Sequence, residues 1–167
     1  LVAVWNTAAY LPQCLESLRR QTLRDIQVVC VDDASTDESL AVLRHYADLD
    51  ERIEVVALPK NQGQAHARNV ALRQAKGEFV CFLDSDDWID ANTCEVAYNS
   101  AIRENADCLM FSYVKEFGTH SIINHIFDED YFVWNSDEIK RNFHRRLFGP
   151  IGHELSCPQD MDIIVSP

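Results

Sequence analysis

Short apolar runs alternate with segments of helical periodicity along the first two-thirds of the chain. The runs are continuously apolar rather than alternating, which is typical of strands buried on both faces of a parallel sheet. They predict five strands, at residues 1–5, 26–31, 53–58, 79–83 and 108–114.

The segments between these runs predict helices. Apolar residues recur at positions 11, 14, 15 and 18, and Pro12 falls in a first turn, where proline is tolerated. We expect Asn6–Thr7 to cap this helix, and Ser35 with Glu38 to form a capping box for the next. Further helices are predicted from after residue 63 to about residue 75, with Gly77 near the C-cap, and at residues 91–104 and 136–147.

Strand and helix alternate at a spacing that predicts right-handed βαβ units. The sequence therefore indicates an α/β fold with three layers, α/β/α, around a mostly parallel central sheet. The pattern weakens from Gly118 onward. The chain begins inside an apolar run without Met and ends within another, so we expect a fragment whose C-terminal part is incomplete.

Composition narrows the classes of partner. The 167 residues carry a formal net charge of −12, which argues against nucleic acid, because phosphate binding needs clustered Lys and Arg. No apolar run approaches the ~20 residues of a transmembrane segment. The six cysteines form no CxxC pair, so zinc has little support. Cys30 and Cys81 lie in strand-like runs and are expected to be buried free thiols in a reducing cytosol.

Acidic side chains follow two of the predicted strands. Open α/β sheets bind ligands where their strands end, so five carboxylates should crowd one rim: Asp32, Asp33, Asp84, Asp86 and Asp87. Such crowding is costly unless a cation or protons neutralise it, and carboxylate oxygens suit Mg²⁺ or Mn²⁺. We expect Asp84 and Asp86 to bind this metal; the alternative is that these residues are solvated turn formers.

Other residues near the strand ends have two interpretations each. The chain has no glycine-rich phosphate loop, and Arg68 either bonds a phosphate or the carboxylate rim, or makes a surface salt bridge. Trp5 could stack on a planar base, although aromatic residues at strand ends are more often core. Trp88 is expected to be a packing anchor rather than a platform for a sugar ring. No Ser-His-Asp or Cys-His set is identifiable.

Several short motifs, in this order and at this spacing, resemble family 2 glycosyltransferases. They are Val2-Ala3-Val4-Trp5-Asn6, Gln21-Thr22, Asp32-Asp33-Ala34-Ser35-Thr36-Asp37, Asn61-Gln62-Gly63, Ala67-Arg68-Asn69 and Phe82-Leu83-Asp84-Ser85-Asp86-Asp87-Trp88. The resemblance implies a Rossmann-like GT-A fold, a UDP-sugar or similar nucleotide-sugar donor, a divalent cation, and inversion at the anomeric carbon.

The resemblance also implies roles for individual residues. Ala3, Trp5 and Asp33 would contact the base, with Asp32 adjacent, and Arg68 would lie near the diphosphate. Asp84 and Asp86 match the Asp-x-Asp motif, and Asp86 is the expected direct ligand of Mn²⁺ or Mg²⁺. Three departures from the family pattern affect the base pocket: Ala3 replaces Pro, Trp5 replaces Tyr, and Ala34 replaces Gly.

On this resemblance, residues 1–115 are the nucleotide-sugar-binding core and residues 116–167 begin an acceptor-side region. The acceptor would be a saccharide or lipid-linked saccharide in bacterial surface polysaccharide synthesis, in the cytoplasm or peripherally at the inner face of the membrane. We expect the general base to lie outside this chain, because no motif selects one of the available carboxylates: Asp128, Glu129, Asp130, Asp160 and Asp162.

Two alternatives stay open on the sequence. A phosphatase of the haloacid dehalogenase type would use Asp84 as its nucleophile, although that motif normally follows the first strand and here follows the fourth. The other alternative is a non-catalytic fragment that binds a nucleotide sugar without turnover.

Overall fold

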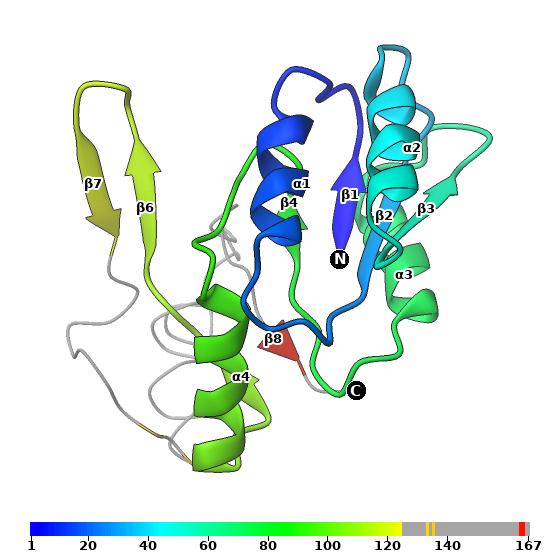
Figure 1. Ribbon diagram of the computed structural model, residues 1–167. Helices are drawn as coiled ribbons and strands as arrows, with labels where there is room; N and C mark the ends of the chain where they lie inside the picture. The colour runs from blue at the N-terminus through cyan, green and yellow to red at the C-terminus, as the bar shows by residue number, and fades with distance from the viewer. Residues whose placement is uncertain (125–132, 134, 136–163, 166–167) are drawn as a thin grey trace, which may run out of the picture. The chain divides into compact units, whose positions relative to one another are not determined.

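The computed structural model describes residues 1–124, 133, 135 and 164–165 (Figure 1). These fall into two compact units, one of residues 1–109 with 164–165, the other containing residues 110–124. The predicted helix at 136–147 and the five carboxylates considered for the general base lie outside the described residues. The functional division at residue 115 stays a prediction.

The first unit is built on a four-stranded sheet in which every neighbouring pair is parallel. Its order is β3-β2-β1-β4, with β1 at Val2–Val4, β2 at Val28–Asp32, β3 at Ile53–Ala57 and β4 at Leu83–Asp84. The central strand β1 pairs with both neighbours, and Ala3 lies opposite Val31 on one side and Asp84 on the other. The chain crosses from β3 to the far side of β1, which creates a topological switch point between β1 and β4.

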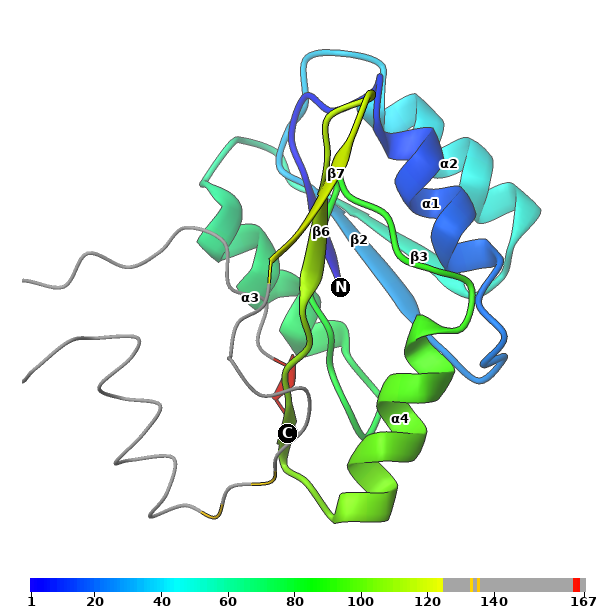
Figure 2. The same ribbon diagram turned by 90° about the vertical axis from the view of Figure 1, so that its left-hand side faces the viewer.

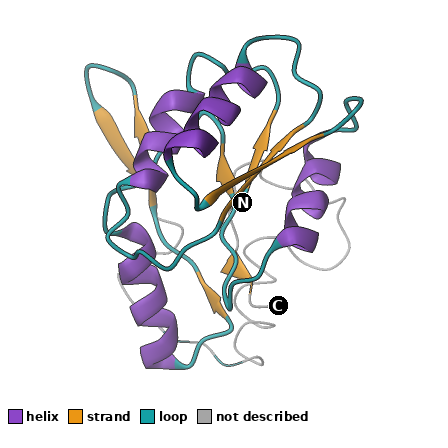
Figure 3. Cartoon of the chain, turned by 45° about the vertical axis from the view of Figure 1, so that its right-hand side comes forward, coloured by secondary structure: helices purple, strands orange, loops and turns teal. Residues whose placement is uncertain are grey.

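Helices cover both faces of this sheet. On one face lie α1 (Leu11–Arg19) and α2 (Ser39–Leu49), and on the other lies α3 (Gln64–Gln74), as Figures 1 and 2 show. The predicted three-layer α/β/α architecture is therefore confirmed. α4 (Thr93–Glu104) leads into β5 (Cys108–Leu109), which pairs antiparallel with β8 (Ile164–Val165) (Figure 3).

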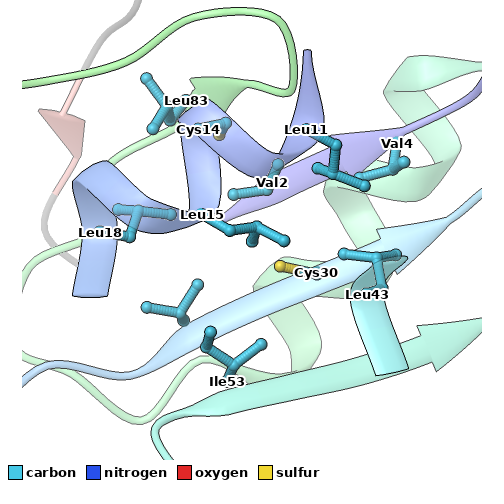
Figure 4. Packing of buried hydrophobic residues seen from close by; sticks show 11 residues of the cluster. Val2, Val4, Leu11, Cys14, Leu15, Leu18, Cys30, Leu43, Ile53 and Leu83 are labelled. Atoms are coloured by element: carbon cyan, nitrogen blue, oxygen red, sulfur yellow. The ribbon is translucent and has the colours of Figure 1, made fainter. Parts of the chain in front are cut away.

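Each face of the sheet has its own apolar cluster. Because both faces are buried, the strands are continuously apolar in sequence. Cys30 of β2 packs toward Leu15 of α1 and Leu43 of α2 in the larger cluster (Figure 4). The neighbouring Val31 points the other way, onto Ala67 and other small residues of α3. Alternate residues of β2 thus serve two cores, so the whole strand is buried.

The cysteines only partly follow expectation. Cys14 and Cys30 are buried free thiols, and burial raises the pKa of each to about 12, so both stay protonated at neutral pH. Cys81 is half-buried rather than buried, because the predicted strand at 79–83 narrows to the short β4.

Both predicted N-caps are wrong. α1 begins at Leu11 and α2 at Ser39, and neither has a side-chain cap. Asn6 and Ser35 instead bind each other's loop: the Asn6 amide donates to Ser35 Oγ at 3.0 Å, and the Thr36 amide donates to Asn6 Oδ1 at 2.7 Å. The polar residues that resemble caps therefore join the loops that follow β1 and β2.

One further boundary differs from prediction. The predicted strand at 108–114 divides into β5 and β6 (Tyr113–Glu116), and β6 forms a hairpin with β7 (Ser121–Asn124) in the second unit. α3 ends at Gln74 with an extended Ala75 as its C-cap, which agrees with the predicted helix end and with Gly77 near the C-cap.

Ala34 adopts a left-handed backbone conformation in the loop after β2, with φ of +58°. A Cβ atom makes this region unfavourable for residues other than glycine. Ala34, which replaces the glycine of the family pattern, therefore has a strained backbone. The hydrogen bonds that join the two loops hold it in this conformation.

We therefore predict that Ala34→Gly raises the free energy of unfolding by about 1 kcal/mol, because it removes the Cβ from a left-handed position. The matched control is Ala41→Gly on the exposed face of α2, which should lower it by about 1 kcal/mol. Urea unfolding of the three proteins checks both signs. Destabilisation by Ala34→Gly would show that the loop does not hold this conformation in solution.

Candidate functional site

A cleft of about 470 Å³ lies at the carboxyl ends of the strands, within the size range of small-molecule sites. It is lined by Ala3, Val4, Trp5, Thr7, Asp33, Asn61, Gly63, Gln64, Ala67, Asp84, Ser85 and Asp86. Most of the predicted site residues are brought together here. Asp32 and Arg68 are the two that do not line it.

Asp33 closes one side of the cleft and is only 2% exposed. Its Oδ1 accepts a hydrogen bond from the Gln62 amide at 2.9 Å, and its Oδ2 accepts one from the Gly63 amide at 2.7 Å. The carboxylate therefore ties the end of β2 to the loop that precedes α3.

Asp32 lies on the opposite face of the sheet, and the expected rim of five carboxylates is wrong. Side chains alternate along β2, so Asp32 shares the face of Cys30, toward α1 and α2. It is 1% exposed, and its Oδ2 accepts a hydrogen bond from the Ser35 amide at 3.2 Å. Asp87 also does not line the cleft, so only Asp33, Asp84 and Asp86 remain there.

Asp84 ends β4 and forms an ion pair with Arg68 of α3. Its Oδ1 accepts hydrogen bonds from Arg68 Nη2 at 2.7 Å and from Gln64 Nε2 at 3.0 Å. The guanidinium group of Arg68 also lies over the Phe82 ring, 5.5 Å from its centroid. Arg68 therefore forms a partly exposed ion pair with one acidic residue of the cleft, and its contact with a phosphate stays a prediction.

Asp86 sits in a tight turn directly after β4, in which the Asp87 amide donates to the Asp84 carbonyl at 3.0 Å. The turn is fixed from the side, because Thr7 Oγ1 donates to the buried Ser85 Oγ at 3.0 Å. Asp86 itself is exposed, and its carboxylate accepts no hydrogen bond from the part of the chain that the structure describes. It is the acidic group of the cleft best placed to meet a ligand.

A buried glutamine holds the segment that follows this turn. Gln21 is fully buried; its Nε2 donates to the Asp90 carbonyl at 2.8 Å, and its Oε1 accepts from the Cys94 amide at 2.9 Å. The Thr22 amide donates to the Ala91 carbonyl at 2.7 Å. The acidic turn is thus anchored on both sides by α1 and its flanking residues.

Within the described residues, no set of three or more His, Cys, Asp or Glu side chains converges to hold a metal alone. This still fits Mg²⁺ or Mn²⁺, which keep water ligands and are usually bound by one or two carboxylates together with substrate phosphates. The side chains that would hold such an ion are Asp86 and the Oδ2 of Asp84, since the Oδ1 of Asp84 is engaged by Arg68 and Gln64.

The aromatic residues near the cleft are more exposed than expected. Trp5 is 55% exposed and lines the cleft, so it is not a core residue, and its indole face is open to a planar ligand. Trp88 is 45% exposed, and its expected role as a packing anchor is wrong.

Some cleft residues escaped the sequence analysis. Gln64 lies one helical turn before Arg68, and this i,i+4 spacing could have indicated that both side chains reach the same acceptor. Thr7, Ser85 and Asn61 gave no comparable signal, because polar residues in loops are common and only the fold brings these together.

Comparison with known proteins decides the family. Residues 1–156 match the family described as Glycosyl transferase family 2. The chain belongs to this family. It is therefore a glycosyltransferase sequence, and its parallel sheet with a cleft at the switch point is the GT-A fold expected for it.

Two relatives from Bacillus subtilis (strain 168) illustrate the similarity. The chain is 37% identical to the putative glycosyltransferase EpsH over 148 residues, which cover 89% of this chain and 42% of EpsH. It is 43% identical to the putative teichuronic acid biosynthesis glycosyltransferase TuaG over 83 residues, 50% of this chain and 33% of TuaG. The chain thus spans less than half the length of either relative.

Two solved structures share the fold. The S. aureus TarS fragment 1–349 in complex with UDP-GlcNAc has a TM-score of 0.69 and 34% identity, over 77% of this chain and 37% of that chain. The mannosyltransferase PcManGT from Pyrobaculum calidifontis, in complex with GDP-Man and Mn²⁺, has a TM-score of 0.56 and 33% identity, over 60% and 30%.

No helix among the described residues is long and apolar enough to cross a membrane.

The contact between Arg68 and Asp84 predicts that Arg68 and a bound metal ion compete for the carboxylate of Asp84. Arg68→Gln removes a positive charge next to the carboxylates, so this glycosyltransferase chain should bind Mn²⁺ alone about threefold more tightly or better. Its stability should change by less than about 1 kcal/mol, because the ion pair is partly exposed. Titration followed by the electron paramagnetic resonance of free Mn²⁺ measures the affinity.

Arg73→Gln is the control, since it removes the same charge from an exposed position of the same helix. Equal Mn²⁺ affinity in both variants would contradict a role for Arg68 at the metal site.

Proposed function

We propose that the chain is the donor-binding part of an inverting enzyme that transfers a sugar from a UDP-sugar to an acceptor hydroxyl with the help of Mn²⁺ or Mg²⁺. The observation that carries this proposal is the cleft itself. It brings the exposed Trp5, the buried Asp33 and the acidic pair Asp84 and Asp86 to one edge of a parallel sheet.

In this proposal the base lies between Ala3, Trp5 and Asp33. The indole of Trp5 offers a stacking face, and the small side chain of Ala3 leaves room at the floor of the cleft. Asp32 is not part of this pocket, because it lies on the other face of the sheet. The diphosphate would extend toward Arg68 and the acidic turn.

Asp86 and the second oxygen of Asp84 would hold the divalent cation. When bound, that cation stabilises the negative charge that grows on the departing nucleoside diphosphate. Arg68 supports the same charge from the other side once diphosphate oxygens compete with Asp84 for its guanidinium group. The acceptor hydroxyl would attack from the opposite face of the sugar, and a carboxylate that no motif of this chain identifies would take its proton.

The comparisons support parts of this proposal. TarS was solved with UDP-GlcNAc, and PcManGT with GDP-Man and Mn²⁺, which supports a nucleotide-sugar donor and a divalent cation. The likeness to a teichuronic acid biosynthesis enzyme supports a saccharide or lipid-linked saccharide acceptor in bacterial surface polysaccharide synthesis. Such work would take place in the cytoplasm or at the inner face of the membrane.

The phosphatase alternative loses its support. In that class of phosphatase the motif normally follows the first strand, whereas Asp84 ends β4. Membership of a glycosyltransferase family favours transfer over phosphate hydrolysis. Binding without turnover stays open as an outcome for a chain that spans less than half of its relatives.

We predict that Asp86→Ala removes the dependence of UDP binding on metal. In the wild-type chain Mn²⁺ should raise UDP affinity, and in the variant that affinity should fall by about tenfold or more, because the exposed ligand is gone. Isothermal titration calorimetry with UDP, with and without Mn²⁺, measures the difference.

The control for this variant is Asp90→Ala, which removes an exposed carboxylate from the same segment without touching the cleft lining. UDP affinity that responds to Mn²⁺ equally in Asp86→Ala and the wild type would refute the proposed metal site.

A further inference from the structure

The N-cap residue of α3 is a glycine, so the loop before this helix has no capping side chain at that position. Gly63 is the N-cap of α3, has a φ of +88°, and makes no side-chain capping bond. A serine or aspartate at this position would ordinarily satisfy the free amides of a helix start. The side-chain acceptor that bonds this loop comes instead from the end of β2.

Asp33 is that group. Both of its oxygens accept loop amides, from Gln62 at 2.9 Å and from Gly63 at 2.7 Å. The side chain is 2% exposed, and hydrogen bonds to a carboxylate are about twice as strong as neutral ones. Among the described residues, these two amides are the hydrogen-bond donors to its buried carboxylate, so the loop and the carboxylate stabilise each other.

The effect of this contact extends to the acidic turn. Gln64 is the first residue of α3 and Arg68 follows one turn later, and both donate to Asp84 Oδ1. The position where α3 starts therefore determines where these two donors lie. Asp33 fixes that start, although it makes no hydrogen bond to Asp84 itself.

We propose that Asp33 is a positioning residue for the diphosphate half of the cleft. By holding Gln62 and Gly63 it orients Gln64 and Arg68 toward Asp84, in addition to any contact it makes with the base. This inference rests on the proposed function. It predicts that losing the carboxylate weakens recognition of a diphosphate whether or not a base is attached.

The test uses Asp33→Asn, which keeps one acceptor oxygen but turns an NH₂ group toward the other loop amide. Calorimetry in Mn²⁺ should show that the variant binds both UDP and inorganic pyrophosphate about tenfold more weakly than the wild type. Asp48→Asn, an exposed change of the same charge on α2, should alter neither affinity. A loss confined to UDP, with unchanged pyrophosphate binding, overturns the proposal.

A second readout does not depend on any ligand. In the wild-type chain the Gln62 and Gly63 amide protons should resonate downfield, as expected for donors to a carboxylate, and they should move upfield in Asp33→Asn. Unchanged chemical shifts of these two amides would show that Asp33 does not hold the loop, and would overturn the proposal. If the wild type binds neither UDP nor pyrophosphate, the proposed function fails, and the amide shifts still test the contact.

A coupling measurement separates positioning from general loss of structure. If Asp33 acts through Arg68, Asp33→Asn and Arg68→Gln should lower pyrophosphate affinity less than additively, and additive losses overturn that link.

Should Asp33→Asn fail to fold, Gly63→Ala strains the same loop with Asp33 intact. An added Cβ there meets no atom within 4 Å, so the effect is confined to the backbone, and pyrophosphate binding should again weaken.

Discussion

The pairing of β1 with two parallel neighbours is the constraint on which the site depends. Ala3 lies opposite Val31 and Asp84, two residues that are 53 positions apart in the sequence. This register places the ends of β2 and β4 on either side of β1, and the reversal of strand order opens a cleft between them. The cleft chemistry is thus a consequence of sheet topology, held by apolar clusters on both faces.

The acidic side chains near the cleft differ in burial and in hydrogen-bond partners, and these differences determine which of them can bind a ligand. Asp33 is buried and bonded to two amides, so its charge organises the protein. Asp84 shares one oxygen with Arg68 and Gln64 and keeps the other for a ligand. Asp86 is exposed in an anchored turn. The three carboxylates thus differ in how many of their oxygens accept hydrogen bonds from the protein, from both oxygens of Asp33 to neither of Asp86 among the described residues. In the proposed function, the less engaged carboxylates bind the cation together with the diphosphate.

Periodicity predicted the three layers and the mostly parallel sheet of the α/β core, because continuous apolarity reflects burial on two faces. It missed the face of Asp32, since two adjacent aspartates at a strand end point to opposite sides. It also misread Asn6 and Ser35 as caps, because capping and loop-bridging residues share the same chemistry. Motif spacing indicated Asp84, Asp86 and Arg68, whereas Gln64 and the role of Gln62 and Gly63 required coordinates.

Paramagnetic broadening by Mn²⁺ tests the central claim, that the switch point of the sheet is where metal and nucleotide meet. With UDP present, trace Mn²⁺ should broaden the amide signals of residues 84–87 most strongly, and those of residues 3–7 and 61–64 next. Amides at the C-terminal end of α2 should stay sharp, because α2 ends at Leu49, shortly before β3 begins at Ile53, and so at the edge of the sheet opposite the cleft. Sharp signals from residues 84–87, with broadening centred elsewhere, would contradict the account.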